Sequence, residues 1–202
     1  MKKILYIALT ILVTSCYAQN PVINITDDDG SEINGAYYQD QNNLLDPYEG
    51  TWLYTNGTTS LKIVLVKKIQ QYNSKYYEDL IIGEYQYIEN GVEKINTLSD
   101  IDIVYNNQRT HHIDGNSIIR NTSKPPCPSC GYTEKRLRLG LTEVDTGLHG
   151  RMIIRRITYN GQLAITINIR AEGNSTPWFE GQPQPPNDFI VHAGDYILIK
   201  QP

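Results

Sequence analysis

The stretch QLAITINIRA, residues 162–171, alternates large apolar residues with small or polar ones. Successive side chains of a strand point to opposite sides, so its leucine and three isoleucines would line one face and the remaining residues the other. The same period of two recurs in residues 61–69 and 137–141. These stretches predict β-strands with one face in a hydrophobic core and the other in solvent.

Eight such strands are predicted along the chain. They span residues 51–56, 60–70, 79–88, 92–103, 134–144, 151–159, 162–171 and 195–200. Asn-Gly pairs at residues 56–57, 90–91 and 160–161 lie between strand-like runs, and these two residue types adopt the positive φ of a type I′ hairpin turn at the lowest cost. Beyond residue 18, no stretch keeps the apolar spacing of an amphipathic helix over three turns.

Short hairpins between consecutive strands describe an antiparallel meander, since a parallel sheet would need crossover helices. We therefore predict an all-β fold in which about 8–10 strands form a closed or nearly closed barrel. The alternative is a two-sheet β-sandwich. Branched aliphatic residues occupy nearly every inward position, and a barrel of about eight strands is only just wide enough for its own side chains. The interior should therefore be mostly filled.

The N-terminus has the pattern of a secretory signal, with two lysines, an apolar run over residues 4–13 and then small residues. Residues 13–16, VTSC, resemble a bacterial lipobox, which makes Cys16 a candidate lipidation site. Cleavage after Ala18 is the alternative. We expect a signal peptide over residues 1–18, or one that ends before Cys16. The protein would then be exported, and either lipid-anchored in the cell envelope or secreted.

Charge excludes some classes of protein and suggests a boundary. The chain has 18 basic and 22 acidic side chains and a net charge of −4, so a basic nucleic-acid-binding surface is not expected. Residues 17–61 contain no lysine or arginine but seven acidic residues. A segment with charges of one sign repels itself and is usually solvated. We therefore expect an acidic extended leader at residues 19–49 and a single β domain at residues 50–202.

Cys127 and Cys130 form a Cys-x-x-Cys pair, which can be half of a zinc site, a redox couple or a local disulfide. The four histidines lack the spacing of a zinc finger. A redox cysteine sits at the start of a helix, and the strand predicted around residue 137 leaves no room for one. Outside the cytoplasm we expect the disulfide.

His111, His112 and Asp114 could suggest a metal or acid–base site. Adjacent side chains of a strand face opposite sides, so at most one histidine could point into a given pocket. A polar pair beside a turn is the preferred interpretation. The chain also lacks the common hydrolase, metalloprotease and phosphate-binding motifs. We therefore expect no catalytic residue, no metal, no cofactor and no enzymatic activity.

Residues 172–187 are rich in proline and glycine and predict a long loop that carries Trp178 and Phe179. These aromatic residues would either plug an end of the barrel or form a lid or contact surface. Together with Trp52 they are the candidate ligand or contact residues.

Gly50-Thr51-Trp52 resembles the Gly-x-Trp start of lipocalins and other calycin barrels, in which the tryptophan closes the barrel base. The mid-chain motif of that family is not evident. Residues 43–57, 83–92 and 196–201 resemble an uncharacterised family of secreted flavobacterial (Bacteroidota) proteins, a domain of unknown function. That resemblance covers nearly the whole mature chain and implies secretion and a bacterial source, but no activity.

Three functions are compatible with these features. The first is a non-enzymatic binding or interaction module of the cell envelope, which would contact a protein or a glycan through tyrosine-rich strand faces. The second is a calycin-like carrier of a small apolar ligand. The third is an enzyme acting on an extracellular substrate. An empty interior of several hundred Å³ would favour the carrier, and a filled interior would leave only the outer surface for binding.

Overall fold

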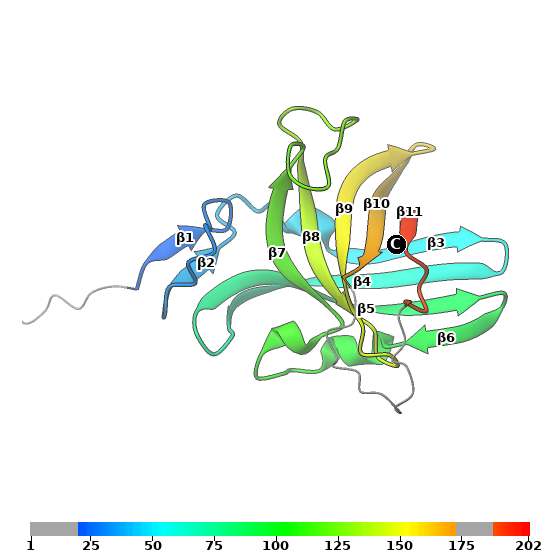
Figure 1. Ribbon diagram of the computed structural model, residues 1–202, viewed down its shortest axis with the longest axis horizontal. Helices are drawn as coiled ribbons and strands as arrows, with labels where there is room; N and C mark the ends of the chain where they lie inside the picture. The colour runs from blue at the N-terminus through cyan, green and yellow to red at the C-terminus, as the bar shows by residue number, and fades with distance from the viewer. Residues whose placement is uncertain (1–19, 173–187) are drawn as a thin grey trace, which may run out of the picture.

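A computed structural model of the chain describes residues 20–172 and 188–202, and this part is almost entirely β (Figure 1). Eight antiparallel strands follow one another around a closed barrel, which confirms the predicted fold class. They are β3 (Gly50–Asn56), β4 (Thr59–Tyr72), β5 (Tyr77–Glu89), β7 (Ile113–Arg120), β8 (Lys135–Thr142), β9 (His149–Tyr159), β10 (Gln162–Ala171) and β11 (Gly194–Lys200). Among the described residues, no helix is long and apolar enough to span a membrane.

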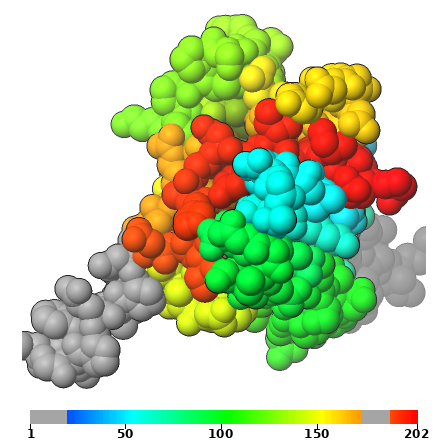
Figure 2. Space-filling model, turned by 90° about the vertical axis from the view of Figure 1, so that its right-hand side faces the viewer, coloured from blue at the N-terminus to red at the C-terminus, as the bar shows by residue number. Residues whose placement is uncertain are grey.

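The barrel closes through two pairings of strands that are distant in the sequence. β11 pairs with β3, where Ile199 lies opposite Leu53, and Figure 2 shows the red β11 against the cyan β3. β5 pairs with β7, where Ile82 lies opposite Asp114. Each of the eight strands is therefore paired on both sides. In Figure 1, β3, β4 and β5 run across the view, and β7, β8 and β9 stand steeply to them.

The side chains that alternate inward fill the barrel. The largest of them are Trp52, Tyr85 and Tyr87, and each is at most 1% exposed. Aliphatic side chains from all around the barrel pack against them and are equally inaccessible. They include Leu61, Ile63, Leu65, Ile81, Ile113, Leu137, Leu139, Met152, Ile154, Ile165, Ile167, Ile169 and Leu198. Because these inward side chains have almost no accessible surface, the described residues leave no room for a ligand inside the barrel.

Leu163 is an exception to the alternation that predicts its burial. It lies at the start of β10, next to the turn, and is 41% exposed, whereas Ile165 is fully buried. The inward face of a strand is covered only as far as its neighbouring strands and the core extend. The hairpin end of β10 projects beyond them.

Residues 20–49 are folded onto the barrel, in contrast to the acidic extended leader that the charge pattern predicts. β1 (Val22–Asn24) pairs in parallel with β2 (Tyr37–Gln39), and β2 pairs in parallel with the start of β5. The 3-10 helix η1 (Asp46–Tyr48) then carries the chain into β3, and Leu45 and Tyr48 are buried in the core. Tyr48 accepts a hydrogen bond from the indole N–H of Trp52 at 2.9 Å, so the end of this segment lies against Trp52.

The acidic charge of this segment is compensated locally, which is why it is not repelled into solvent. The carboxylate of Asp40 is fully buried and accepts hydrogen bonds from the backbone N–H groups of Leu44 and Leu45. It also accepts one from Lys67 Nζ at 3.0 Å. Lys67 contacts Asp46 as well. A single lysine of β4 thus pairs with two carboxylates of the segment.

The region between β5 and β7 is less extended than predicted. β6 (Val92–Asn96) pairs with the far end of β5 and stops at Asn96, and residues 98–102 form the 3-10 helix η2 (Leu98–Asp102). A second 3-10 helix, η3 (Gln108–Thr110), precedes β7. The side chain of Asn96 accepts a hydrogen bond from the N–H of Leu98, a local bond that competes with strand pairing.

β7 is absent from the strands predicted by periodicity. Its centre is polar, Gly115 has a φ of 141°, and the register against β8 shifts between Asp114 and Ser117. A bulge of this kind inserts an extra residue and interrupts the alternation on which the prediction depends.

The three turns predicted from Asn-Gly pairs differ in type. Asn90 and Gly91 both have positive φ, as do Asn160 and Gly161, as type I′ turns require. In the hairpin between β3 and β4 only Gly57, with a φ of 60°, is in that region. A single glycine at the first central position is typical of a type II′ turn.

Candidate functional site

The outer faces of β7 to β11 carry a groove. Three hollows of about 370, 440 and 540 Å³ adjoin one another along it. The first two share Arg151 and Glu172, and the second and third share Ile153 and Arg170. The hollows are therefore neighbours on the outer face, and together they make up the groove.

Most of the arginines of the chain line this groove, which we call the arginine groove. Six of the eight arginines do so, namely Arg109, Arg136, Arg138, Arg151, Arg155 and Arg170. Lys124 also lines it, against three acidic residues, Asp114, Glu172 and Asp195. The groove is therefore positively charged on a protein whose net charge is −4.

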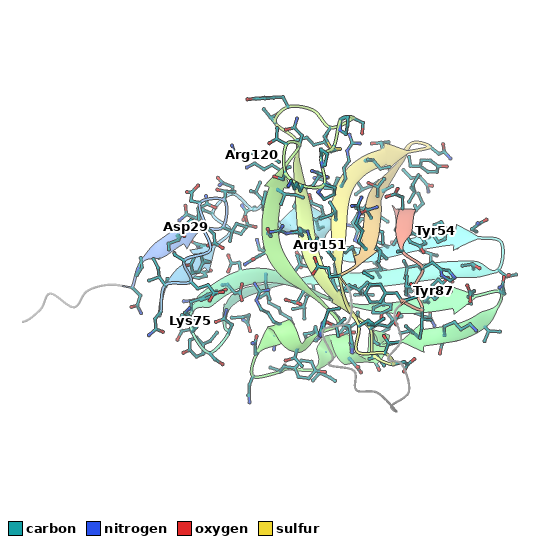
Figure 3. The ribbon with its side chains drawn as sticks, viewed as in Figure 1. Asp29, Tyr54, Lys75, Tyr87, Arg120 and Arg151 are labelled. Carbon is teal, nitrogen blue, oxygen red and sulfur yellow. A yellow bond between two sulfur atoms is a disulfide. The ribbon has the colours of Figure 1, made fainter. Side chains whose placement is uncertain are left out.

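The alternation of three neighbouring strands places the arginines side by side. The residues that alternate with them, such as Leu137, Met152, Ile154 and Ile169, point into the core. The outward-facing arginines are Arg136 and Arg138 of β8, Arg151 and Arg155 of β9, and Arg170 of β10. Figure 3 labels Arg151 among these strands. Arg170 lies directly opposite Arg151 in the β9–β10 register. Like charges at directly opposed positions of a sheet are destabilising, so folding alone does not favour this pair.

Carboxylates neutralise some of these arginines. Arg155 forms an ion pair with Glu134 through Nε at 2.6 Å, and this hydrogen bond holds the pKa of Glu134 below its usual value. Arg151 forms an ion pair with Glu172 at the edge of the groove. Both pairs are partly exposed, so a charged ligand could exchange with the carboxylates.

Arg109 is held more firmly than the others. Its guanidinium forms two hydrogen bonds with the buried carboxylate of Glu78, at 2.6 and 2.7 Å, and one with Asp114 at 2.8 Å. Burial alone would lower the pKa of Arg109, but the hydrogen bonds and charge of these carboxylates raise it well above the usual value. Arg109 is thus a fixed structural cation at one end of the groove.

Arg138 and Arg170 bind no carboxylate within residues 20–172 and 188–202. Arg138 donates to the hydroxyl of Ser117 at 2.9 Å, and Arg170 donates through Nε to the amide oxygen of Asn168 at 2.7 Å. Both contacts orient a guanidinium without neutralising it. Within the described residues, these two side chains are therefore among the groove cations that no carboxylate neutralises.

A short loop forms one wall of the groove. Cys127 and Cys130 are joined by a disulfide within it. Arg136, nearly buried, donates to the carbonyl of Pro125 at 2.9 Å, and Arg155 donates to the carbonyl of Ser129 at 3.2 Å. The disulfide and these two arginines therefore fix the wall against the sheet.

The candidate contact residues named from the sequence lie elsewhere. Trp52 is fully buried, and its indole N–H donates to the carbonyl of Tyr48 at 2.9 Å, so it is not accessible to a ligand. Cys16, Trp178 and Phe179 lie outside the described residues.

The two histidines correct the argument from strand geometry. His111 and His112 both contact the carboxylate of Glu84, at 2.8 and 2.7 Å. They lie between η3 and β7, where the alternation of a strand does not apply. Asp114 turns away from them and pairs with Arg109.

The arginine groove was not recognised from the sequence, although a signal is present. Arginines occupy alternate polar positions in strand-like runs that are consecutive in the chain, as in Arg136 and Arg138. In a meander, consecutive strands are neighbours, so such residues meet on one face. The contribution of Arg109 had no signal of this kind, because it depends on how η3 folds back.

A comparison with protein-family models identifies the chain. The model of DUF6705, a family of unknown function, matches residues 1–201. The chain belongs to this family. Neither a curated protein nor a solved structure is detectably similar to it.

Proposed function

We propose that this DUF6705 member is a non-enzymatic binding module of the cell envelope that binds an acidic polysaccharide in the arginine groove. The observation that carries the proposal is the gathering of six of the eight arginines along one groove. Arginine is suited to this task because its planar guanidinium binds carboxylate and sulfate groups through two parallel hydrogen bonds.

The shape of the groove supports an extended ligand. Three adjoining hollows follow one another over five strands, so a linear polymer could contact arginines at several points along its length. Beside the cations lie neutral hydrogen-bonding groups, including Asn116, Ser117, Thr166 and Asn168. Such groups can bind the hydroxyls of sugar rings between the acidic substituents.

A peptide is a less suitable occupant. Extended peptides commonly bind by adding a strand to an open sheet edge. Here β8, β9 and β10 are each paired on both sides. The carrier of a small apolar ligand is also poorly supported, because the inward side chains leave no accessible space beside them.

Binding of polygalacturonate oligosaccharides, measured by calorimetry, tests the proposal. We expect saturable binding that weakens as salt is raised, since charge attraction is screened. The double variant Arg138→Gln/Arg170→Gln should lower the affinity about tenfold or more, because two charge-assisted contacts are lost. The matched control Arg120→Gln/Arg156→Gln removes the two arginines outside the groove and should bind like the wild type.

Several results would contradict it. Equal affinities for a neutral galactan and the acidic oligosaccharide, or equal affinities of the two double variants, would each contradict the proposal. Preference for a polyglutamate peptide or for an oligonucleotide of equal charge would assign the groove to another class of ligand.

The proposed location depends on the N-terminal signal. A protein anchored at Cys16, or secreted after cleavage at Ala18, would meet polysaccharides outside the cytoplasm. If Cys16 is acylated, Cys16→Ser should abolish the incorporation of labelled palmitate and release the protein from membranes. A wild type that incorporates no palmitate would support secretion.

A further inference from the structure

A second polar cluster lies on the outside of the barrel, away from the proposed function. Glu84 alternates along β5 with the inward Gly83 and Tyr85, so its side chain points out of the barrel. Its carboxylate is nevertheless fully buried. Oε1 contacts Nδ1 of His111 at 2.8 Å, and Oε2 contacts Nδ1 of His112 at 2.7 Å.

The chain after β6 brings a second carboxylate to this position. The hydroxyl of Thr97 bonds to the backbone N–H and carbonyl of Tyr85, at 3.1 and 3.2 Å, which ties the start of η2 to β5. The N–H of Asp100 donates to the carbonyl of Thr97 at 2.9 Å. One ligand atom each of Glu84, Asp100 and His112 consequently lies within 4.8 Å of the other two.

The three side chains differ in exposure in a way that suits a bound ion. Glu84 is buried, whereas Asp100 and His112 are both partly exposed. An ion could therefore enter from the side of Asp100 and His112, with the buried carboxylate behind it. His111 is only 1% exposed and holds Oε1 of Glu84, which leaves Oε2 on the side of His112.

We propose that Glu84, Asp100 and His112 bind a divalent metal ion of the Zn²⁺ type, with His111 as a positioning residue. Two ligands of a tetrahedral zinc ion lie about 3.3–3.6 Å apart, so no pair of these ligand atoms, which all lie within 4.8 Å of one another, needs to approach by more than about 1.5 Å. Nδ1 of His112 and Oε2 of Glu84, at 2.7 Å, instead move apart to admit the ion. His112 exchanges its hydrogen bond to Oε2 for the metal. The hydrogen bond from His111 fixes the carboxylate, as the outer partners of metal ligands commonly do.

The donor set favours zinc over the alkaline-earth ions. Calcium takes six to eight oxygen ligands, and magnesium keeps several waters and requires an octahedral site. An imidazole with two carboxylates suits Zn²⁺ and its neighbours in the first transition series. Three protein ligands leave a fourth position of the tetrahedron for water.

Metal titration of the full chain tests this site. After dialysis against a chelator, we expect the wild type to bind one Zn²⁺ per chain by calorimetry. Co²⁺ at the same site should give visible absorption bands, which report the ligand geometry. His112→Ala and Asp100→Asn should each lower the Zn²⁺ affinity at least tenfold and weaken the Co²⁺ bands. His192→Ala is the control. His192 is exposed and pairs with Glu89, and it is not one of the three proposed ligands.

The outcomes separate a metal site from a structural ion pair. A wild type that binds no Zn²⁺, or variants that bind it as tightly as the wild type, would overturn the proposal and leave Glu84, His111 and His112 as a structural network. If His112→Ala fails to fold, as judged by circular dichroism, the Zn²⁺ affinity of Asp100→Asn decides the question. Asp100 is partly exposed, and asparagine has the same shape as aspartate. The oligosaccharide-binding test does not depend on this result, because these three ligands do not line the arginine groove.

Discussion

At the scale of single residues, two aromatic side chains decide how one end of the barrel is closed. Trp52 occupies the interior at that end, and its N–H donates to the carbonyl of Tyr48. Tyr48 itself is only 4% exposed, and burial, partly offset by the charge of Arg156, raises the pKa of its phenol to about 12. The core at this end therefore contains a group that must stay neutral.

This burial predicts a loss of stability at alkaline pH. The phenol binds its proton more tightly in the folded state than in the unfolded state, where its pKa is about 10. Its stabilising contribution is fully present below pH 10 and is lost as the pH rises from 10 to 12. Urea unfolding at pH 9.5 and at pH 11.5 measures this loss. Between these two pH values, the free energy of unfolding of Tyr48→Phe should fall by about 2 kcal/mol less than that of the wild type.

Tyr132→Phe is the control for this measurement, because Tyr132 is 88% exposed. It should follow the wild type at both pH values. Equal losses in Tyr48→Phe and the wild type would show that the Tyr48 phenol is not held neutral by the fold.

At the scale of elements, the segment from β1 to η1 depends on a few polar contacts to the barrel. The buried carboxylate of Asp40 binds two backbone N–H groups of its own segment and Nζ of Lys67 on β4. Next to it, Asp79 of β5 accepts from the backbone N–H of Asp40 and from the hydroxyl of Tyr37. These bonds hold the segment over the barrel end.

Removal of the lysine should loosen this segment. Lys67→Met leaves the carboxylate of Asp40 buried without its cation, which should lower the free energy of unfolding by about 2–4 kcal/mol. In a Trp178→Phe background, it should also make the fluorescence of Trp52 more accessible to an aqueous quencher, because Tyr48 of this segment contacts the indole of Trp52. Lys68→Met, at a neighbouring position with no ion pair among the described residues, should change stability by no more than about 0.5 kcal/mol.

At the scale of the whole molecule, the interior and the outer surface have different roles. The interior is occupied by branched aliphatic and aromatic side chains, and the charges that could bind a ligand are gathered on the outside of β7 to β11. Arg151 lies on that surface, whereas Tyr87 is buried; both are labelled in Figure 3. A barrel of about eight strands encloses little more than its own side chains.

The filled interior predicts that a hydrophobic probe dye finds no site in the barrel. In fluorescence titration, we expect no stoichiometric binding at micromolar concentration and no effect of added fatty acid. Saturable binding of one dye per chain, displaced by fatty acid, would instead indicate a cavity. It would favour the carrier function over the groove.

The sequence by itself determined the all-β class and most of the barrel strands. A period of two is a local property, since neighbouring side chains of a strand alternate whatever the rest of the chain does. The strand predicted at residues 162–171 matches β10, and that at 151–159 differs from β9 only at its start. The hairpin glycines were readable for the same reason, because their positive φ depends on adjacent residues alone.

Only the tertiary structure decided which polar residues meet. His111, His112 and Asp100 reach Glu84 because η2 and η3 fold back over β5, which no local pattern encodes. The segment that ends at Tyr48 binds the barrel because Asp40 pairs with Lys67 and donates its own N–H to Asp79, and both partners are distant in the sequence. Such contacts form between residues whose separation is set by the whole fold. Charge counted along the chain predicts repulsion, whereas charge arranged in space gives pairing.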